Sequence, residues 1–228
     1  METNHTEKGV MIEVEELNKT YVMGDEKCIA VNDVSFKIYS KQIVAIMGKS
    51  GSGKTTLLNM IGTMDCPSSG RVILKGQDMA GLKQNVRTRF RRNHIGLVFQ
   101  FFHLLPMLTL EENILLPLQI NHAKVNHTYF EELVSVMGLQ DKLHYYPDQL
   151  SGGQQQRGAI ARALIHKPDI LLADEPTGNL DSTTSEEVVT LLFQCVKKYN
   201  LTFLYVTHDA DMGKKADRIF YMDDGRVT

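Results

Sequence analysis

The chain has 228 residues, of which 43% are hydrophobic and 23% are charged, and its formal net charge is −2. This length and apolar content suffice for one large domain with a buried core. The near-neutral charge predicts no broad basic surface, so we expect no nucleic acid among its partners. Three cysteines without a C-x-x-C pair argue against a disulfide framework or a zinc site and indicate buried thiols.

The first ten residues are polar and lack the apolar stretch of a secretion signal. The best candidate for a membrane span, 93–110, carries no charge but is interrupted by polar side chains and a proline. We therefore expect a cytoplasmic protein that reaches a membrane only through a partner.

Apolar runs and segments of helical periodicity alternate along most of the chain. Strands are predicted at 10–17, 34–38, 43–47, 71–74, 95–100, 170–174, 202–207 and 218–222. Helices are predicted at 54–63, 108–118, 128–137 and 153–166, and from Asp181 or Ser182 to about Asn200. Strands and helices alternate at both ends while the middle is mainly helical, which predicts an α/β fold with a parallel sheet and a helical insertion.

A glycine-rich segment, 48–55, fits the pattern G-x-x-x-x-G-K-[ST] between a predicted strand and a predicted helix. Its backbone N–H groups and the helix N-terminus are suited to phosphates. Lys54 would reach the β- and γ-phosphates, the Thr55 hydroxyl would ligate Mg²⁺, and Thr56 would bind the α-phosphate. The predicted ATP-binding residues here are Gly48, Lys49, Ser50, Gly51, Ser52, Gly53, Lys54, Thr55 and Thr56.

The alternative interpretation of this segment is a glycine-serine turn that binds nothing. By itself the phosphate loop (48–55) would suit a GTPase, a kinase or an ATPase. A GTPase also needs an N-K-x-D segment downstream of the loop, and the sequence has none.

Two acids, Asp174 and Glu175, end the apolar strand predicted at 170–174. Ligands of parallel α/β sheets bind at the carboxyl ends of the strands. Asp174 would hold Mg²⁺, and Glu175 would orient or deprotonate the attacking water. The alternative is a solvated strand end, which the upstream phosphate loop disfavours.

A second glycine motif, Leu-Ser-Gly-Gly-Gln at 150–154 (the signature segment), opens another predicted helix. A helix N-terminus with free N–H groups again favours an anion. One nucleotide needs one such cradle, so the second makes sense if it covers the nucleotide of another chain. A helix cap without a ligand is the alternative.

With these motifs in this order the sequence resembles the ABC ATPase family over nearly its whole length. It looks most like the ATPases of lipoprotein-releasing, macrolide-efflux and antimicrobial-peptide-resistance transporters and of a related cell-division complex. The closest segments are 48–59, 95–100, 150–157 and 174–181. Lys49 replaces a usual Pro, and Gly158 replaces a usual Val, which should loosen its helix slightly.

The resemblance implies one ABC ATPase domain over residues 1–228. Its parts would be a phosphate-loop core with a mainly parallel sheet, an N-terminal antiparallel β subdomain, and a helical subdomain inserted at about 101–155. Its cofactors would be ATP and Mg²⁺.

The same resemblance assigns further residues. Gln100 would contact Mg²⁺ and water, His208 would contact the γ-phosphate, and Tyr21 would stack on adenine. Asp181, together with Asn179 and Leu180, would lie in the loop that crosses to a second subunit. Two copies would sandwich ATP, each offering Ser151, Gly152, Gly153 and Gln154 to the ATP of its partner.

The family further implies a membrane permease as partner, with the chain on the inner face of the cell membrane. The apolar run 101–107 would either pack the subdomains together or line a groove for a helix of that permease. An ABC ATPase of DNA repair would need a coiled coil or a zinc insertion between the two glycine motifs, and this sequence has neither. A translation factor of the family would need two ABC ATPase domains in one chain, and this sequence predicts one. The alternative that stays open is an ATPase that regulates a membrane partner without transport.

Overall fold

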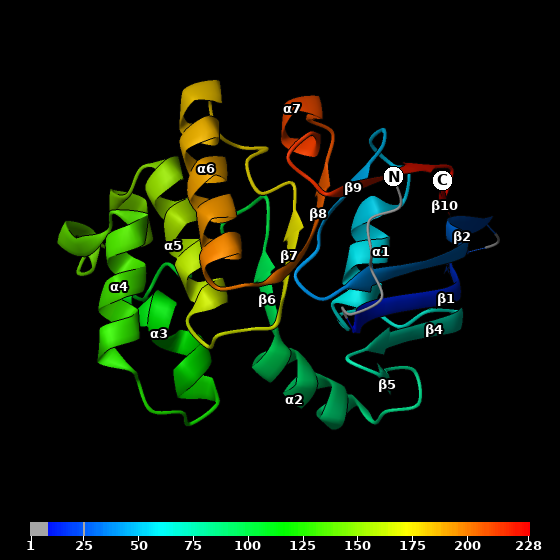
Figure 1. Cartoon of the computed structure of the whole chain (residues 1–228), viewed down its shortest axis with the longest axis horizontal. Coiled ribbons are helices and arrows are strands. Elements are labelled where there is room, and N and C mark those ends of the chain that lie inside the picture. The colour runs from blue at the N-terminus through cyan, green and yellow to red at the C-terminus, as the bar shows by residue number, and fades with distance from the viewer. Residues whose placement is uncertain (1–8, 25) are drawn as a thin grey trace. The chain divides into compact units, whose positions relative to one another are not determined.

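The computed structural model describes residues 9–24 and 26–228, so the polar N-terminus expected from the sequence lies outside the described residues. The chain forms two compact units (Figure 1). The first contains the chain up to Arg91 together with Leu201–Thr228, and the second contains Arg92–Asn200.

An antiparallel sheet of four strands dominates the N-terminal part of the first unit. Its strand order is β2-β1-β4-β5, with β1 at Val10–Met23, β2 at Glu26–Tyr39, β4 at Ser69–Leu74 and β5 at Gln77–Asp78. The long strands β1 and β2 lie side by side in Figure 1, but their register shifts at Leu17 and Lys19. These irregularities let the pair twist and continue past Leu17, where the alternation of the sequence stops.

The rest of the first unit is built around β3 (Ile43–Met47), which is parallel to both β8 (Thr202–Thr207) and β9 (Arg218–Asp223). The two-residue strand β10 (Arg226–Val227) pairs antiparallel with β9. Helix α1 (Lys54–Ile61) packs on β8 and on β1 and β2, and the short α7 (Ala210–Gly213) packs on β3 and β8. The central strands β3 and β8 are almost fully buried.

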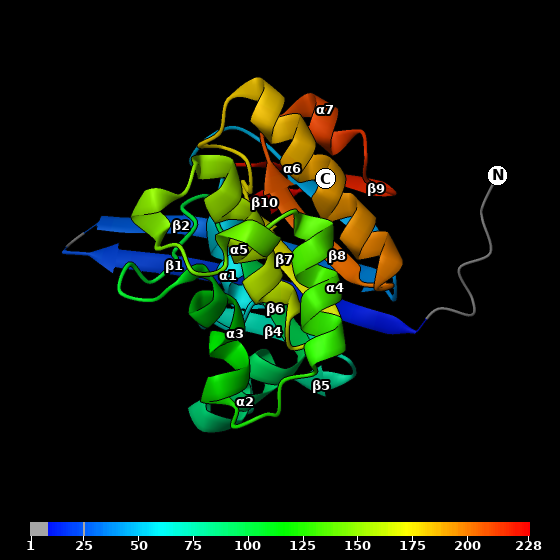
Figure 2. The same ribbon diagram turned by 90° about the vertical axis from the view of Figure 1, so that its left-hand side faces the viewer.

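The second unit contains the parallel strands β6 (Ile95–Val98) and β7 (Ile170–Asp174) and most of the helices (Figure 2). These helices are α3 (Leu110–Ile120), α4 (His127–Met137), α5 (Gly152–Leu164) and α6 (Ser182–Lys198), with two short 3₁₀ turns at Gln140–Lys142 and Pro147–Gln149. Helix α5 is their common neighbour, since it packs against α3, α4, α6 and β6.

Gly158 has a different effect from the loosening that the sequence suggests. It is buried in α5, and a Cβ at this position would lie 2.4 Å from Leu110 Cδ1 of α3. The missing side chain therefore lets α5 approach α3 closely. The close packing of the two helices offsets the low helix propensity of glycine.

The predicted fold class is confirmed: an antiparallel N-terminal sheet accompanies mainly parallel strands and a run of helices between β6 and β7. The sequence missed α2 (Gln84–His94), α7, β5 and β10. The boundaries 101–155 of the helical subdomain stay a prediction. In the described range no helix has the length and apolar character needed to cross a membrane. Cys195 is buried as expected, but Cys28 and Cys66 are exposed, so that expectation was wrong for two of the three.

Candidate functional site

The phosphate loop connects β3 to α1 and is tightly seated on the rest of the first unit. A Cβ on Gly48 would lie 2.1 Å from the carbonyl oxygen of Met222, and one on Gly53 would lie 2.0 Å from that of Ala30. Gly53 also has a φ of +101°. Only glycine satisfies both demands, so these two positions fix the path of the loop.

Lys54 begins α1, and its side chain turns back into the phosphate loop. Its ammonium group donates to the carbonyl oxygens of Gly48 at 2.9 Å and Lys49 at 2.6 Å. The residue is 5% exposed, and the Ser52 hydroxyl lies 3.5 Å from its nitrogen. A buried cation therefore lies inside a ring of backbone groups at a helix N-terminus, an arrangement suited to a polyphosphate.

His208 leaves the sheet beside the phosphate loop. Met47 pairs with Thr207 in the parallel ladder of β3 and β8, so the loop and His208 follow neighbouring strands at the same edge. His208 is exposed, and the next residue, Asp209, caps α7 by accepting hydrogen bonds from the Asp211 and Met212 N–H groups. In the first unit the structure thus brings together two segments that the sequence assigned to one site.

Tyr21 lies on β1 and is 38% exposed, so its ring is accessible to a ligand. Its hydroxyl donates to Asp65 Oδ2 at 2.8 Å, and the Lys19 ammonium lies 4.8 Å from the ring centroid. Burial raises the pKa of Tyr21, and so does the hydrogen bond to Asp65, whereas a hydrogen bond with Thr56 lowers it. The contact with Thr56 relates Tyr21 to the first turn of α1.

In the second unit the carboxylates and Gln100 also follow neighbouring strands. Val98 of β6 pairs with Ala173 of β7, so 99–100 and 174–175 leave the ladder at the same edge. Glu175 has a φ of +42°, in the left-handed region that costs energy for a residue with a side chain. Such strain is typical of functional positions.

Gln100 contacts the segment that follows Glu175. Its Nε2 donates to Asn179 Oδ1 at 3.4 Å, and Asn179 Nδ2 donates to the Gln100 carbonyl oxygen at 3.1 Å. A Cβ on Gly178 would lie 2.8 Å from Gln100 Nε2. The backbone of Gly178 thus supports the Gln100 side chain directly.

Ser151 is the N-cap of the 13-residue helix α5. Its hydroxyl accepts a hydrogen bond from the Gln154 N–H at 3.3 Å, while the Gln154 side chain accepts one from the Ser151 N–H at 2.9 Å. This capping box stabilises the helix start. Ser151 itself is exposed. Asp181 in turn caps α6, accepting from the Thr184 N–H at 3.0 Å.

Gln156, in the next turn of α5, is 0% exposed and holds two of these segments. Its Nε2 donates to the carbonyl oxygen of Phe99 at 3.3 Å and to that of Pro176. Its Oε1 is buried and makes no hydrogen bond in the part of the chain described. Gln156 therefore joins the helix of the signature segment to the residues beside Gln100 and Glu175.

Sequence reasoning missed three residues at these sites, Lys19, Asp65 and Gln156, and it did not predict the hydrogen bonds between Asn179 and Gln100. A polar side chain on the buried face of α5 was a usable signal for Gln156. Lys19 and Asp65 gave none, because they are 46 residues apart and meet only in the folded chain.

Comparison with known proteins identifies the family. A sequence model of the family described as "ABC transporter" matches residues 31–178. The lipoprotein-releasing system ATP-binding protein LolD of Syntrophotalea carbinolica is 44% identical over 221 residues, which cover 96% of this chain and 97% of LolD. The macrolide export ATP-binding/permease protein MacB of Shigella flexneri is 42% identical over 96% of this chain, which spans only 34% of MacB.

Solved structures agree. The dimeric structure of MJ0796, a bacterial ABC transporter cassette, gives a TM-score of 0.88 at 42% identity and covers 95% of this chain and 96% of that one. A second dimeric structure of MJ0796, in a post-hydrolysis state with ADP and Pi, gives a TM-score of 0.87 at 41% identity. The chain therefore belongs to the ABC transporter family, as an ATP-binding subunit of the LolD and MacB type.

Proposed function

We propose that this chain binds ATP with Mg²⁺ and hydrolyses it to power a separate membrane permease. The observation that carries the proposal is the phosphate loop, in which the buried Lys54 ammonium lies among the backbone groups of a glycine-rich turn at the N-terminus of α1. A cation and backbone N–H groups at a helix N-terminus are suited to phosphate groups.

Metal binding is supported by the chemistry of the candidate ligands. Thr55 offers a hydroxyl in the first turn of α1, Gln100 an amide oxygen and Asp174 a carboxylate at the end of β7. Oxygen donors of this kind suit Mg²⁺, which would neutralise charge on the phosphates. Thr56 would hold the α-phosphate, and Lys54 the β- and γ-phosphates.

For hydrolysis, Glu175 would take a proton from the attacking water as general base, while Gln100 orients that water. His208 would donate to the γ-phosphate. The support for these roles is that each residue follows the carboxyl end of a parallel strand, the edge at which ligands of such sheets bind.

Two copies would act together. Ser151 and the N–H groups of Gly152, Gly153 and Gln154 would cover the γ-phosphate bound to the partner copy, with Asp181 at the crossing loop. The dimeric MJ0796 structures support this arrangement, as does the exposed N-cap residue Ser151. ATP would close the dimer and hydrolysis would open it, which provides the mechanical step.

Coupling to the permease would use the segment 101–107, which follows Gln100. Phe101 is 65% exposed and Met107 is 75% exposed, although both are large apolar residues. Exposed apolar side chains grouped in one segment are typical of a protein interface. The chain would thus work on the cytoplasmic face of the membrane, bound to the permease.

The test is Glu175→Gln, with Glu187→Gln on the exposed face of α6 as the matched control. The Glu175 variant should bind ATP with unchanged affinity, release phosphate at least about 100-fold more slowly, and accumulate as an ATP-dependent dimer on gel filtration. The Glu187 variant should match the wild type. Wild-type hydrolysis in the Glu175 variant would refute the general-base role, and a wild type that binds no ATP would refute the proposal as a whole.

A further inference from the structure

Tyr21 is held from two sides by side chains that the family motifs do not include. Lys19 and Tyr21 are two residues apart on β1, and their side chains are in contact. The Lys19 ammonium lies 4.8 Å from the centroid of the Tyr21 ring. A cation at this distance is attracted to the ring face and covers it.

Asp65 connects these two residues. It accepts a hydrogen bond from Lys19 through Oδ1 at 2.7 Å and one from the Tyr21 hydroxyl through Oδ2 at 2.8 Å. Lys19 also donates to the Cys66 carbonyl oxygen at 2.7 Å, and its side chain is only 12% exposed. The lysine is therefore fixed by two acceptors, and the ring is fixed both at its hydroxyl and at one face.

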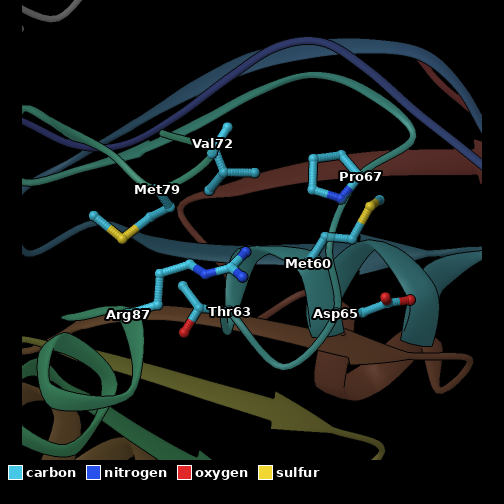
Figure 3. Close-up of a pocket in the computed structure, with 8 residues that line it drawn as sticks. Met60, Thr63, Asp65, Pro67, Val72, Met79 and Arg87 are labelled. Atoms are coloured by element: carbon cyan, nitrogen blue, oxygen red, sulfur yellow. The ribbon is translucent and has the colours of Figure 1, made fainter. Parts of the chain in front are cut away.

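The loop at 62–68 that carries Asp65 is itself anchored on the opposite side by α2. Arg91 donates to the Thr63 carbonyl oxygen at 2.8 Å, and Arg87 Nη1 lies 2.8 Å from Cys66 Sγ. Figure 3 shows a hollow that Thr63, Asp65 and Arg87 help to line, with Arg87 beside Thr63 and the Asp65 carboxylate pointing away from Arg87. The hollow has a volume of about 10 Å³, about enough for one water molecule, so it is too small to hold a nucleotide base.

Protonation states fit this arrangement. Burial alone would raise the pKa of Asp65, but hydrogen bonds from Lys19, Tyr21 and the Cys66 N–H outweigh it and lower that pKa. Burial and the bond to Asp65 raise the pKa of Tyr21. Asp65 is therefore ionised and Tyr21 protonated at neutral pH, so the hydroxyl proton is committed to Asp65 and is not available to read a base.

We propose that Lys19 and Asp65 are positioning residues, which hold one face of Tyr21 against the protein and present the other face to the base of the bound nucleotide. This inference rests on the proposed ATP binding. It adds which residues allow the nucleotide base to contribute to the binding affinity. Because the tyrosine hydroxyl is committed, recognition is by stacking alone and accepts adenine and guanine alike.

The test compares ATP with inorganic tripolyphosphate, both with Mg²⁺, by isothermal titration. Tripolyphosphate fills the phosphate loop without a base, so the ratio of the two affinities isolates the stacking contribution. Lys19→Met should weaken ATP binding about threefold to tenfold, since the Tyr21 ring loses the contact that fixes its orientation, and leave tripolyphosphate unchanged. Lys19→Arg should restore most of the ATP affinity.

The matched control is Lys37→Met, which breaks the Lys37–Glu13 ion pair of 2.6 Å between β2 and β1. It should change neither affinity. Asp65→Asn provides a second variant, which keeps the shape of the side chain but weakens its hold on Lys19. It should reproduce the selective loss of ATP affinity.

Three outcomes separate the two proposals. Tyr21→Ala should weaken ATP and GTP by similar factors, and if it does so while Lys19→Met and Asp65→Asn bind ATP normally, the positioning role is refuted and stacking stands. Equal losses of affinity for ATP and tripolyphosphate in Lys19→Met and Asp65→Asn would likewise refute the positioning role, because they would show a general effect on the fold. A wild-type chain that binds neither ligand would refute the proposed function, and the inference with it.

Discussion

Gln100 and Asn179 are 79 residues apart in sequence, yet their side chains and backbone exchange two hydrogen bonds. In the proposed function Gln100 faces the γ-phosphate site and the permease, whereas Asn179 lies in the loop that crosses to the second copy. We therefore expect a displacement of one loop to move the other, within a single unit of the chain.

Gly178→Ala tests this coupling, because its Cβ would lie 2.8 Å from Gln100 Nε2 and must push that side chain aside. We expect kcat for ATP hydrolysis to fall about tenfold or more through misplacement of Gln100, with KM nearly unchanged. Gly81→Ala, where a Cβ meets nothing within 4 Å, is the control. If both variants hydrolyse ATP at the same rate, Gln100 does not need its present position.

Gln156→Met should lower both stability and turnover. Methionine has a similar shape but cannot donate to the carbonyl oxygens of Phe99 and Pro176, which remain buried. The free energy of unfolding should fall by about 1–3 kcal/mol in urea titrations. The exposed Gln140→Met should cost less than about 0.5 kcal/mol. Equal losses in the two variants would contradict the role of Gln156 as the connecting residue.

His166 makes stability depend on pH. Burial lowers its pKa below the ordinary value of 6.5, and repulsion from His94 adds to this, although a hydrogen bond to the Ile95 carbonyl oxygen opposes both. Below pH 6.5 the unfolded chain therefore takes up a proton at His166 before the folded chain does. The contribution of His166 to stability is thus present above that pH and lost as pH falls.

The measurement is urea denaturation at about pH 7.5 and about pH 5.5, on either side of the ordinary histidine pKa. His166→Gln should lose less stability on acidification than the wild type does. His144→Gln, whose side chain is 90% exposed in the wild type, should behave as the wild type. An unchanged pH dependence in the His166 variant would contradict this account.

Phe101→Ser should separate hydrolysis from coupling. The side chain is 65% exposed, so its removal should leave the fold and the ATPase rate of the free chain intact. Copurification with the permease should be lost, because the apolar contact is replaced by a polar one. Ile120→Ser, an exposed apolar residue at the end of α3, is the control. A Phe101 variant that keeps the complex would contradict docking at 101–107.

The secondary structure was predictable where buried positions form a clear run of apolar residues in the sequence. Strands β3 and β8 have the predicted bounds because every position is apolar or buried. Helix α2 was missed because its Arg-rich sequence has no buried residue and no apolar period. Strand β1 was cut short at Leu17, because the register shifts that follow break the alternation.

The chemistry of the site was predictable only where it depends on consecutive residues. The phosphate loop and the signature segment are local, so spacing along the chain reveals them. Contacts such as Lys19 with Asp65 or Gln156 with Phe99 join distant segments and require the sheet register or the helix packing. The environment of Phe102 could not be predicted from the sequence either. Phe102 borders Gly152 and is partly buried, so the more exposed Phe101 is better suited to docking.

The position of the Lys54 ammonium group has a practical consequence for mutagenesis. Because it donates to the Gly48 and Lys49 carbonyl oxygens, it acts as an internal brace, and phosphate binding must exchange some of these bonds for new ones. Lys54→Ala would therefore release the loop as well as abolish binding, and amide hydrogen exchange across 48–53 should rise in the nucleotide-free chain. A loss of function in such a variant reports on the brace and the phosphate contact together.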